Sequence, residues 1–256
     1  IRTTYMQVPD VGAYPTVVSL LVGKGQLVAT REVVLDEIRK SPPYHMRPRT
    51  HELTVYDAVT GASKSTAVDL EYDDFGNVTS ETFLGFLDEQ GDERITESRF
   101  LQNVPAFITN TVMRSTPYRG TAAVGTVVSD TKYLYDNAMS ELHIPSVGLL
   151  TGRLRWNELV GVYLAYGIAY DQFGNILEQT APGGEVTESR VVSDGVFVDE
   201  LRDALYPGDP RHAVTFEWDR VCGKPTRVIN SNGRPVVVRY DEFCRAVRIE
   251  SPTGSL

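Results

Sequence analysis

Apolar and polar residues alternate along several short stretches of the chain. In residues 213–218, Val214, Phe216 and Trp218 fall on one side of the alternation, and Thr215 and Glu217 fall on the other. A period of two residues is typical of a β-strand with one apolar and one polar face. The same criterion predicts strands at residues 67–72, 132–135, 213–218, 236–240 and 246–250.

Several of these predicted strands end at an aromatic residue that is followed by aspartate. Two such sites continue almost identically, as YDDFGN from Tyr72 and YDQFGN from Tyr170. Aspartate can accept hydrogen bonds from the backbone N–H groups of a turn, and Gly-Asn tolerates the positive φ angles of a tight reversal. The motif therefore predicts a β-hairpin. The aromatic–aspartate pairs are Tyr56-Asp57, Tyr72-Asp73, Tyr135-Asp136, Tyr170-Asp171, Trp218-Asp219 and Tyr240-Asp241.

We assign a structural role, not a catalytic one, to the best-preserved motif positions, because a turn-capping aspartate explains the acidic residues without further assumption. We also predict that Tyr72, Tyr170 and Tyr240 pack as a ladder along one face of the sheet. The motif positions are Tyr72, Asp73, Gly76, Asn77, Tyr170, Asp171, Gly174, Asn175, Trp218, Asp219, Gly223, Tyr240 and Asp241.

The spacing between motifs is uneven. Trp218 and Tyr240 are 22 residues apart, which fits turn, strand, turn and strand, whereas 48 residues separate Tyr170 from Trp218. Insertions must fill the longer gaps. One predicted short helix carries Val198, Leu201 and Leu205 after a possible cap at residues 193–194, and Pro207-Gly208 ends it. Residues 27–40 fit a helix or a strand about equally well.

The stretches YDQFGNILEQTAPGG and WDRVCGKPTRVINSNGRPVVVRYDEFCRAVRIESPTG resemble the YD repeats of the Rhs family, which also includes the metazoan teneurins. Within that family the chain is most similar to the B component, or the B/C fusion, of bacterial insecticidal toxin complexes. The stretch YDDFGNVTSETFLGFLDEQGDERITESRFLQNVPAFITN, followed by KYLYDN, carries that similarity. Residues 1–66 give only a weak repeat signal, and residues 67–256 form the YD-repeat segment.

The resemblance implies a mainly β fold of antiparallel hairpins that forms part of a large curved sheet or cocoon shell. It implies a secreted or exported structural protein that encapsulates a toxic C-terminal effector, with the other toxin-complex components as partners. A teneurin-like module for cell-surface adhesion or recognition is the alternative. Because the chain opens without methionine, we expect a fragment whose exposed strand edges could pair with other chains.

Charge and motif content point away from other classes of function. The net charge of −9 disfavours nucleic acid, whose binding needs clustered lysine and arginine. The four histidines have no zinc-type spacing, and no nucleophile elbow or phosphate loop is present. We therefore expect no enzymatic activity, no metal and no cofactor. The most apolar region, residues 147–170, is interrupted by Arg153, Arg155 and Glu158, so we expect no membrane span.

The two cysteines, Cys222 and Cys244, lie 22 residues apart at equivalent places in consecutive repeats. Equivalent positions in stacked hairpins are two strands apart, roughly 9 to 10 Å. A disulfide needs Cα atoms within about 7 Å of each other. We therefore expect free, partly buried thiols.

Overall fold

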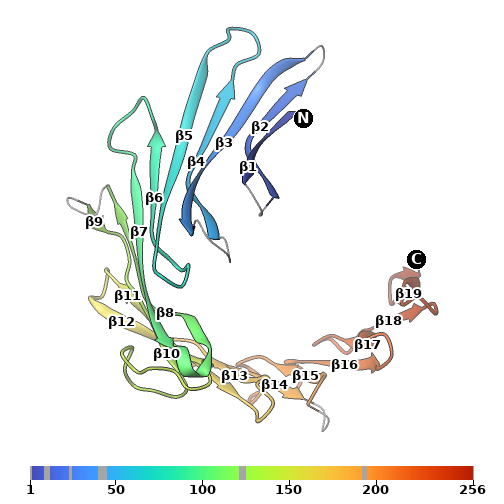
Figure 1. The fold of residues 1–256 in the computed structure, drawn as a ribbon. Coiled ribbons are helices and arrows are strands. Elements are labelled where there is room, and N and C mark those ends of the chain that lie inside the picture. Colours follow the sequence, from blue (N-terminus) through green and yellow to red (C-terminus); the bar gives the residue numbers. More distant parts are fainter. Residues whose placement is uncertain are drawn as a thin grey trace. The chain divides into compact units, whose positions relative to one another are not determined.

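The computed structural model describes residues 2–8, 12–22, 25–39, 45–120, 125–191 and 195–255. Over these residues the protein is built of antiparallel β-strands (Figure 1). The only helical element in the described ranges is one 3-10 turn, η1 (Val104–Ala106). The predicted mainly β, antiparallel fold is therefore confirmed. The chain divides into two compact units, the first made of residues 1–133, 139–148 and 155–162 and the second of residues 134–138, 149–154 and 163–256.

The first unit is an antiparallel meander in which each strand from β1 to β8 pairs with the next. β8 then forks, because β9 pairs with its last two residues and the start of β10 pairs with Arg114 and Ser115. The strands are β1 (Arg2–Val8), β2 (Gly12–Val22), β3 (Gln26–Arg39), β4 (His45–Tyr56), β5 (Ser63–Tyr72), β6 (Val78–Phe86), β7 (Arg94–Asn103), β8 (Ile108–Arg119), β9 (Thr126–Val127) and β10 (Thr131–Tyr135).

A buried ionic group fixes this fork. Asp130 is 5% exposed, and its side chain accepts hydrogen bonds from Arg114 Nε at 2.7 Å and Nη2 at 2.8 Å. Thr116 Oγ1 donates a further hydrogen bond of 3.1 Å to Asp130 Oδ1. The Asp130 carbonyl accepts the N–H of Trp156 at 2.7 Å. The buried carboxylate thus has the paired, multiply bonded surroundings that burial of a charge requires.

The second unit is a meander of short hairpins in which each strand from β12 to β20 pairs with the next. β10, β11 (Leu150–Asn157) and β12 have residues in both units. The remaining strands are β12 (Val162–Tyr170), β13 (Ile176–Thr180), β14 (Val186–Val191), β15 (Val198–Arg202), β16 (Ala213–Asp219), β17 (Lys224–Ile229), β18 (Pro235–Tyr240), β19 (Ala246–Ser251) and β20 (Gly254–Ser255).

All five strands predicted from alternation are present, within β5, β10, β16, β18 and β19, and each extends one to four residues beyond the prediction. The division at residue 66 stays a prediction. Residue 66 itself lies inside β5, which pairs with both β4 and β6.

The predicted helix around Val198, Leu201 and Leu205 is wrong. Val198–Arg202 forms strand β15, which pairs with β14 on one side and β16 on the other. Two ladder neighbours satisfy the backbone hydrogen bonds that a helix would have made internally, so tertiary pairing overrides the helical spacing. Residues 193–194, the expected cap, lie outside the described residues. Of the two interpretations of residues 27–40, the strand is confirmed, as β3 (Gln26–Arg39).

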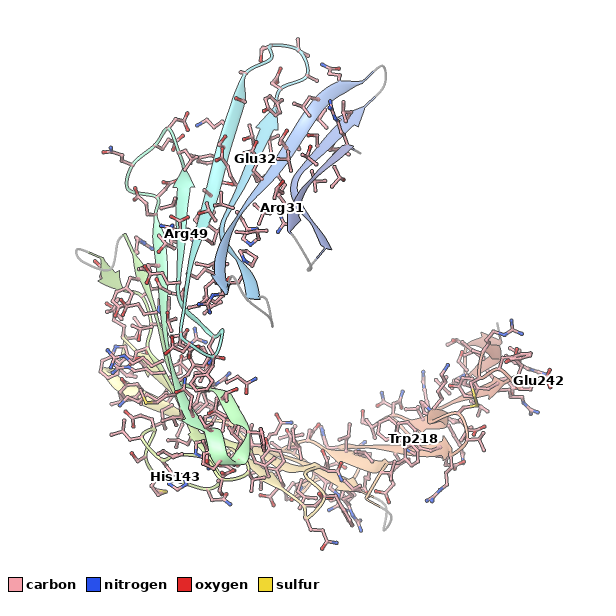
Figure 2. The ribbon with its side chains drawn as sticks, viewed as in Figure 1. Arg31, Glu32, Arg49, His143, Trp218 and Glu242 are labelled. Carbon is pink, nitrogen blue, oxygen red and sulfur yellow. A yellow bond between two sulfur atoms is a disulfide. The ribbon has the colours of Figure 1, made fainter. Side chains whose placement is uncertain are left out.

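Very few side chains are buried. Among the described residues, the buried apolar side chains are Ala67, Ile95, Tyr135 and Pro145. The exposed surface is 16859 Å², whereas a compact chain of 28.4 kDa exposes about 11,000 Å². Within the described part of each unit, side chains project from both faces of the strands (Figure 2). Each unit is therefore a single sheet and not a sandwich.

Candidate functional site: the aromatic–aspartate turns

Three of the YD motifs, at Asp73, Asp171 and Asp241, close a β-hairpin with a five-residue turn that the aspartate of the motif organises. Asp171 Oδ1 accepts the backbone N–H of Phe173 and of Asn175, both at 2.8 Å. The backbone closes the same turn, because Asp171 N–H donates to Asn175 O and Gly174 N–H donates to Asp171 O. Asp73 and Asp241 accept the equivalent pairs of hydrogen bonds, from Phe75 and Asn77 and from Phe243 and Arg245.

These hydrogen bonds hold the aspartates in their charged form. The Asn175 side-chain amide and then the backbone N–H groups lower the pKa of Asp171 below its usual value. For Asp73 burial acts first and would raise the pKa, but the hydrogen bonds from Asn77, Phe75 and Gly76 outweigh it, so the pKa is lowered. At Asp241 the Arg245 side chain is the largest cause of a lowered pKa. The carboxylates therefore act as turn caps.

The fourth position of the turn adopts a left-handed backbone conformation. Gly76 has φ +89° and Gly174 has φ +87°, values that favour glycine. In the turn that starts at Asp241, Cys244 occupies this position with φ +59°. A cysteine is therefore held where the motif otherwise places glycine.

A β-bulge accompanies the aromatic residue in all four motifs that were singled out from the sequence. The strand register shifts by one residue between the aromatic residue and the one before it, at Glu71/Tyr72, Ala169/Tyr170, Glu217/Trp218 and Arg239/Tyr240. Bulges bend a strand and increase its twist. The motif thus combines a turn with a fixed local bend.

The aromatic residue ties each hairpin back to the preceding strand. The Tyr170 hydroxyl donates a hydrogen bond of 2.8 Å to Leu150 O on β11, and Trp218 Nε1 donates one of 2.7 Å to Val198 O on β15. Tyr72 and Tyr240 do the same to Pro48 O on β4 and Pro225 O on β17, at 2.7 and 2.9 Å. Burial raises the pKa of Tyr170, which keeps its hydroxyl protonated and able to donate. The predicted stacking of Tyr72, Tyr170 and Tyr240 as one ladder stays a prediction.

The asparagine that ends the full motif ties the hairpin forward. Asn175 Nδ2 donates to Gly195 O beside β15, and Asn77 Nδ2 donates to Thr109 O on β8, each at 2.7 Å. In both cases the accepting carbonyl lies in, or just before, the third strand after the turn. A complete motif is therefore bonded to both of its neighbours along the sheet.

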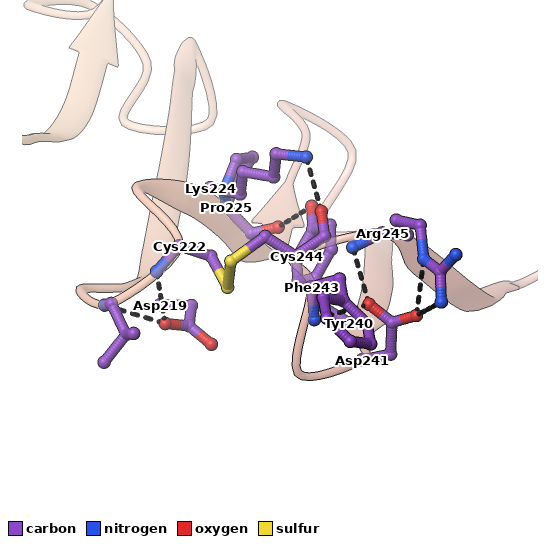
Figure 3. Close-up of a disulfide and its surroundings, with 10 residues drawn as sticks. Asp219, Cys222, Lys224, Pro225, Tyr240, Asp241, Phe243, Cys244 and Arg245 are labelled. Carbon is purple, nitrogen blue, oxygen red and sulfur yellow. Dashed lines mark hydrogen bonds and ion pairs between the residues drawn. A yellow bond between two sulfur atoms is a disulfide. The ribbon is translucent and has the colours of Figure 1, made fainter.

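The last two motifs are tied differently, and here one sequence-based expectation is wrong. Cys222 and Cys244 form a disulfide with a Cα–Cα distance of 5.4 Å (Figure 3). The spacing of two strands applies to residues inside the sheet, but both cysteines lie in turns. The turn at Asp219 is one residue longer than the turns at Asp73, Asp171 and Asp241, since Asp219 pairs with Lys224. These turns protrude beyond the ladder and approach one another.

Lys224 reinforces this link. It follows Gly223 as Asn77 follows Gly76, and its Nζ donates a hydrogen bond of 2.6 Å to Cys244 O in the next hairpin. The ammonium also lies 5.5 Å from the centre of the Tyr240 ring. Lysine thus makes the forward tie that asparagine makes in the complete motifs.

The two faces of the second unit differ in charge. From the strand register, Ile168, Gln179, Leu201, Phe216 and Val238 share one face of β12 to β18, and these five residues are all uncharged. The opposite face carries charges of both signs, which pair across neighbouring strands as Arg190–Glu200, Arg202–Glu188, Arg227–Glu217 and Arg239–Glu250. We call these the uncharged face and the charged face.

The described residues offer little that resembles a catalytic centre. His212 Nδ1 lies 2.9 Å from Asp203 Oδ2, with substantial exposure of both side chains. The neighbouring Arg211 lowers the pKa of Asp209 to about 2. No group of three histidine, cysteine, aspartate or glutamate side chains that could hold a metal ion occurs in the described ranges. No helix within them is long and apolar enough to cross a membrane.

Solved structures of toxin complexes share this fold. The crystal structure of TcdB2-TccC3-Cdc42 matches with a TM-score of 0.60 at 9% identity, over 88% of this chain and 15% of that chain. The Photorhabdus luminescens Tc holotoxin pore matches with a TM-score of 0.59 at 10% identity, over 88% and 15% of the two chains. The crystal structure of TcdB2-TccC3 without its hypervariable C-terminal region matches with a TM-score of 0.58 at 9% identity, over 88% of this chain and 15% of that chain.

The likeness is one of fold. No protein-family model matches the sequence, and no curated protein sequence matches it. The chain spans about 15% of the length of the toxin-complex chains that it matches. The predicted resemblance to toxin-complex shell proteins is therefore supported at the level of three-dimensional structure.

Sequence reasoning missed the ties between hairpins. The carbonyls that Tyr170 and Asn175 bind lie 20 residues away in either direction, and backbone acceptors leave no sequence signal. The disulfide did leave a sequence signal. Cys222 and Cys244 are 22 residues apart, which is also the spacing between Trp218 and Tyr240, so the cysteines occupy equivalent places in the two motifs.

Proposed function

We propose that this chain is a segment of the wall of an Rhs-type toxin-complex shell, which encapsulates a toxic C-terminal effector for delivery. The observation that carries the proposal is the likeness of fold to TcdB2-TccC3 over 88% of the chain. The wall's partners are the enclosed effector and the other toxin-complex components. The complete protein is secreted or exported, and this segment contributes no catalysis and no nucleic-acid binding.

The architecture of the sheet suits a wall. A single layer leaves both faces available, one toward a cavity and one toward solvent. Ties in both directions along the sheet make each hairpin a link between its neighbours, as in repeat proteins whose stability comes from adjacent units. Pairing each repeat with the next also covers strand edges.

Cysteine labelling tests whether the sheet forms a closed wall. Thr187 and Arg190 are exposed residues of β14 on the uncharged and the charged face, respectively. Thr187→Cys and Arg190→Cys would be made in the complete open reading frame that encodes this chain, and treated with a maleimide that carries a bulky polyethylene glycol chain. We expect one variant to react at once and the other only after denaturation. Equal reaction of both variants would show that the sheet does not enclose a space.

Proteolysis tests for cargo. After trypsin digestion of the complete native protein, we expect mass spectrometry to find an intact, non-wall polypeptide protected inside the shell. A closed wall without a protected polypeptide would contradict encapsulation and would favour the teneurin-like recognition module.

A further inference from the structure

The disulfide joins the turns of two consecutive hairpins at one end of their strands. Cys222 lies in the turn between β16 and β17, and Cys244 lies in the turn between β18 and β19. β17 and β18 pair with each other, so the bond spans this ladder from outside it (Figure 3). The crosslink thus closes a loop of 22 residues that contains the whole β17–β18 hairpin.

The crosslink stands where a lysine replaces the asparagine of the complete motifs. In the complete motifs, the asparagine amide also binds its own aspartate, at 2.8 Å for Asn77 and 2.9 Å for Asn175, and is thereby oriented for the forward hydrogen bond. Lys224 has a long flexible side chain and is exposed. A flexible exposed ammonium loses more side-chain entropy on forming a fixed contact. Cys244 also takes a backbone conformation that glycine adopts more readily.

We propose that the Cys222–Cys244 disulfide is a reducible latch that holds the β18–β19 hairpin against the β16–β17 hairpin, and that a dithiol reductant releases it. In an oxidising medium the last hairpins are fixed. Reduction removes the covalent link and leaves the Lys224 and Tyr240 hydrogen bonds and the β17–β18 ladder to hold the strained turn at Cys244, so the hairpin opens locally more often.

The chemistry is thiol–disulfide exchange. A thiolate of the dithiol attacks one cysteine sulfur and forms a mixed disulfide, and the other cysteine leaves as a thiolate that takes up a proton. The second thiol of the reductant then attacks the mixed disulfide, which releases the remaining cysteine and leaves the reductant as its own disulfide. Two electrons pass from the dithiol to the protein.

The surroundings allow the exchange. Both cysteines are only half-buried, so a dithiol can reach them. Lys224 donates a hydrogen bond to the Cys244 carbonyl, which places one cation in the turn of the disulfide. A positive charge in this region stabilises the thiolate that must leave.

Hydrogen exchange of the full chain, measured by mass spectrometry with and without dithiothreitol under native conditions, tests the latch. We expect reduction to speed amide exchange in peptides covering residues 235–251 at least tenfold. Exchange around the Asp171–Asn175 turn, which Asn175 ties without a thiol, should not change. Iodoacetamide should label both cysteines of the reduced native chain and neither cysteine of the oxidised chain.

A matched variant separates the crosslink from other effects of the reductant. Cys222→Ser/Cys244→Gly removes both sulfurs and restores the glycine of the motif, so its exchange should be the same with and without dithiothreitol. Resistance of the disulfide to dithiothreitol until the protein is denatured would overturn the proposal. Unchanged exchange in residues 235–251 after reduction would overturn it as well.

Discussion

The Tyr170 hydroxyl donates a hydrogen bond of 2.8 Å to the carbonyl oxygen of Leu150, on the strand before its own. The aromatic residues at positions 72, 218 and 240 make the same kind of bond, with an indole N–H in place of the hydroxyl at Trp218. This contact gives the aromatic residue of the motif a physical role, because it joins one hairpin to the preceding strand and packs a large ring against the sheet.

Two substitutions at Tyr170 separate the contribution of its hydrogen bond to stability from the contribution of its ring. Tyr170→Phe should lower the free energy of unfolding by about 1 kcal/mol, since it removes one hydrogen bond and leaves the Leu150 carbonyl without that donor. Tyr170→Ala should lower it by about 3 kcal/mol, because the packing of the ring is lost as well. Urea denaturation of the two variants and the parent measures both effects. Equal stability of all three proteins would mean that neither the hydrogen bond nor the ring of Tyr170 stabilises the fold.

The turn aspartates make stability depend on pH. Their pKa values are lower in the folded chain than in the unfolded one. Their contribution is therefore fully present above the unfolded value, near about pH 4, and is lost as the pH falls through the lowered folded value. We expect the urea midpoint to fall with acidification below about pH 4. Asp171→Asn should give a flatter pH profile than the parent, and a profile as steep as the parent's would contradict this.

The left-handed position of Cys244 predicts a stabilising substitution once the disulfide is absent. Cys222→Ser/Cys244→Gly should be more stable than Cys222→Ser/Cys244→Ser by about 1 kcal/mol, because glycine adopts φ near +60° without the steric penalty that a side chain meets. Thermal or urea unfolding of the two double variants decides the matter. Greater stability of the serine variant would show that this backbone position is not strained.

The ionic group at the β8 fork should be more important for stability than surface ion pairs. Asp130→Ala leaves Arg114 without the carboxylate that it binds through two nitrogens. This should lower the free energy of unfolding by about 2 kcal/mol. The loss is smaller than for a fully buried ion pair because Arg114 is partly exposed. Glu217→Ala, which breaks the exposed Glu217–Arg227 pair, is the control and should change it by less than about 1 kcal/mol. If urea denaturation showed similar losses of unfolding free energy for Asp130→Ala and Glu217→Ala, the buried ion pair would be no more important for stability than the exposed one.

The open edge of β19 predicts association of the isolated chain. Over residues 246–249 the described structure pairs β19 only with β18, and β20 covers only Glu250 and Ser251 on the other side. Such an edge is a template for strand pairing. We expect light scattering after size-exclusion chromatography to show a mass that rises with concentration. A monomer at every concentration would show that the edges are protected.

Several hairpins could be predicted from local sequence patterns alone. Period-two alternation predicts five of the strands, and Asp followed three residues later by Gly predicts the turns at Asp73 and Asp171, because both are local properties of the backbone and its nearest side chains. The resemblance of the YD motifs to Rhs repeats also pointed to the fold that the toxin-complex structures share.

The links between hairpins depend on contacts between residues far apart in the chain and could not be predicted in this way. Residues 198–202 form a strand because two neighbours supply their hydrogen bonds, and the cysteines bond because their turns protrude and meet. The acceptors of Tyr170 and Asn175 are backbone carbonyls about one hairpin away, and every residue carries such a group. Which carbonyl is used depends on register and bulges, and these are fixed only when the strands pair.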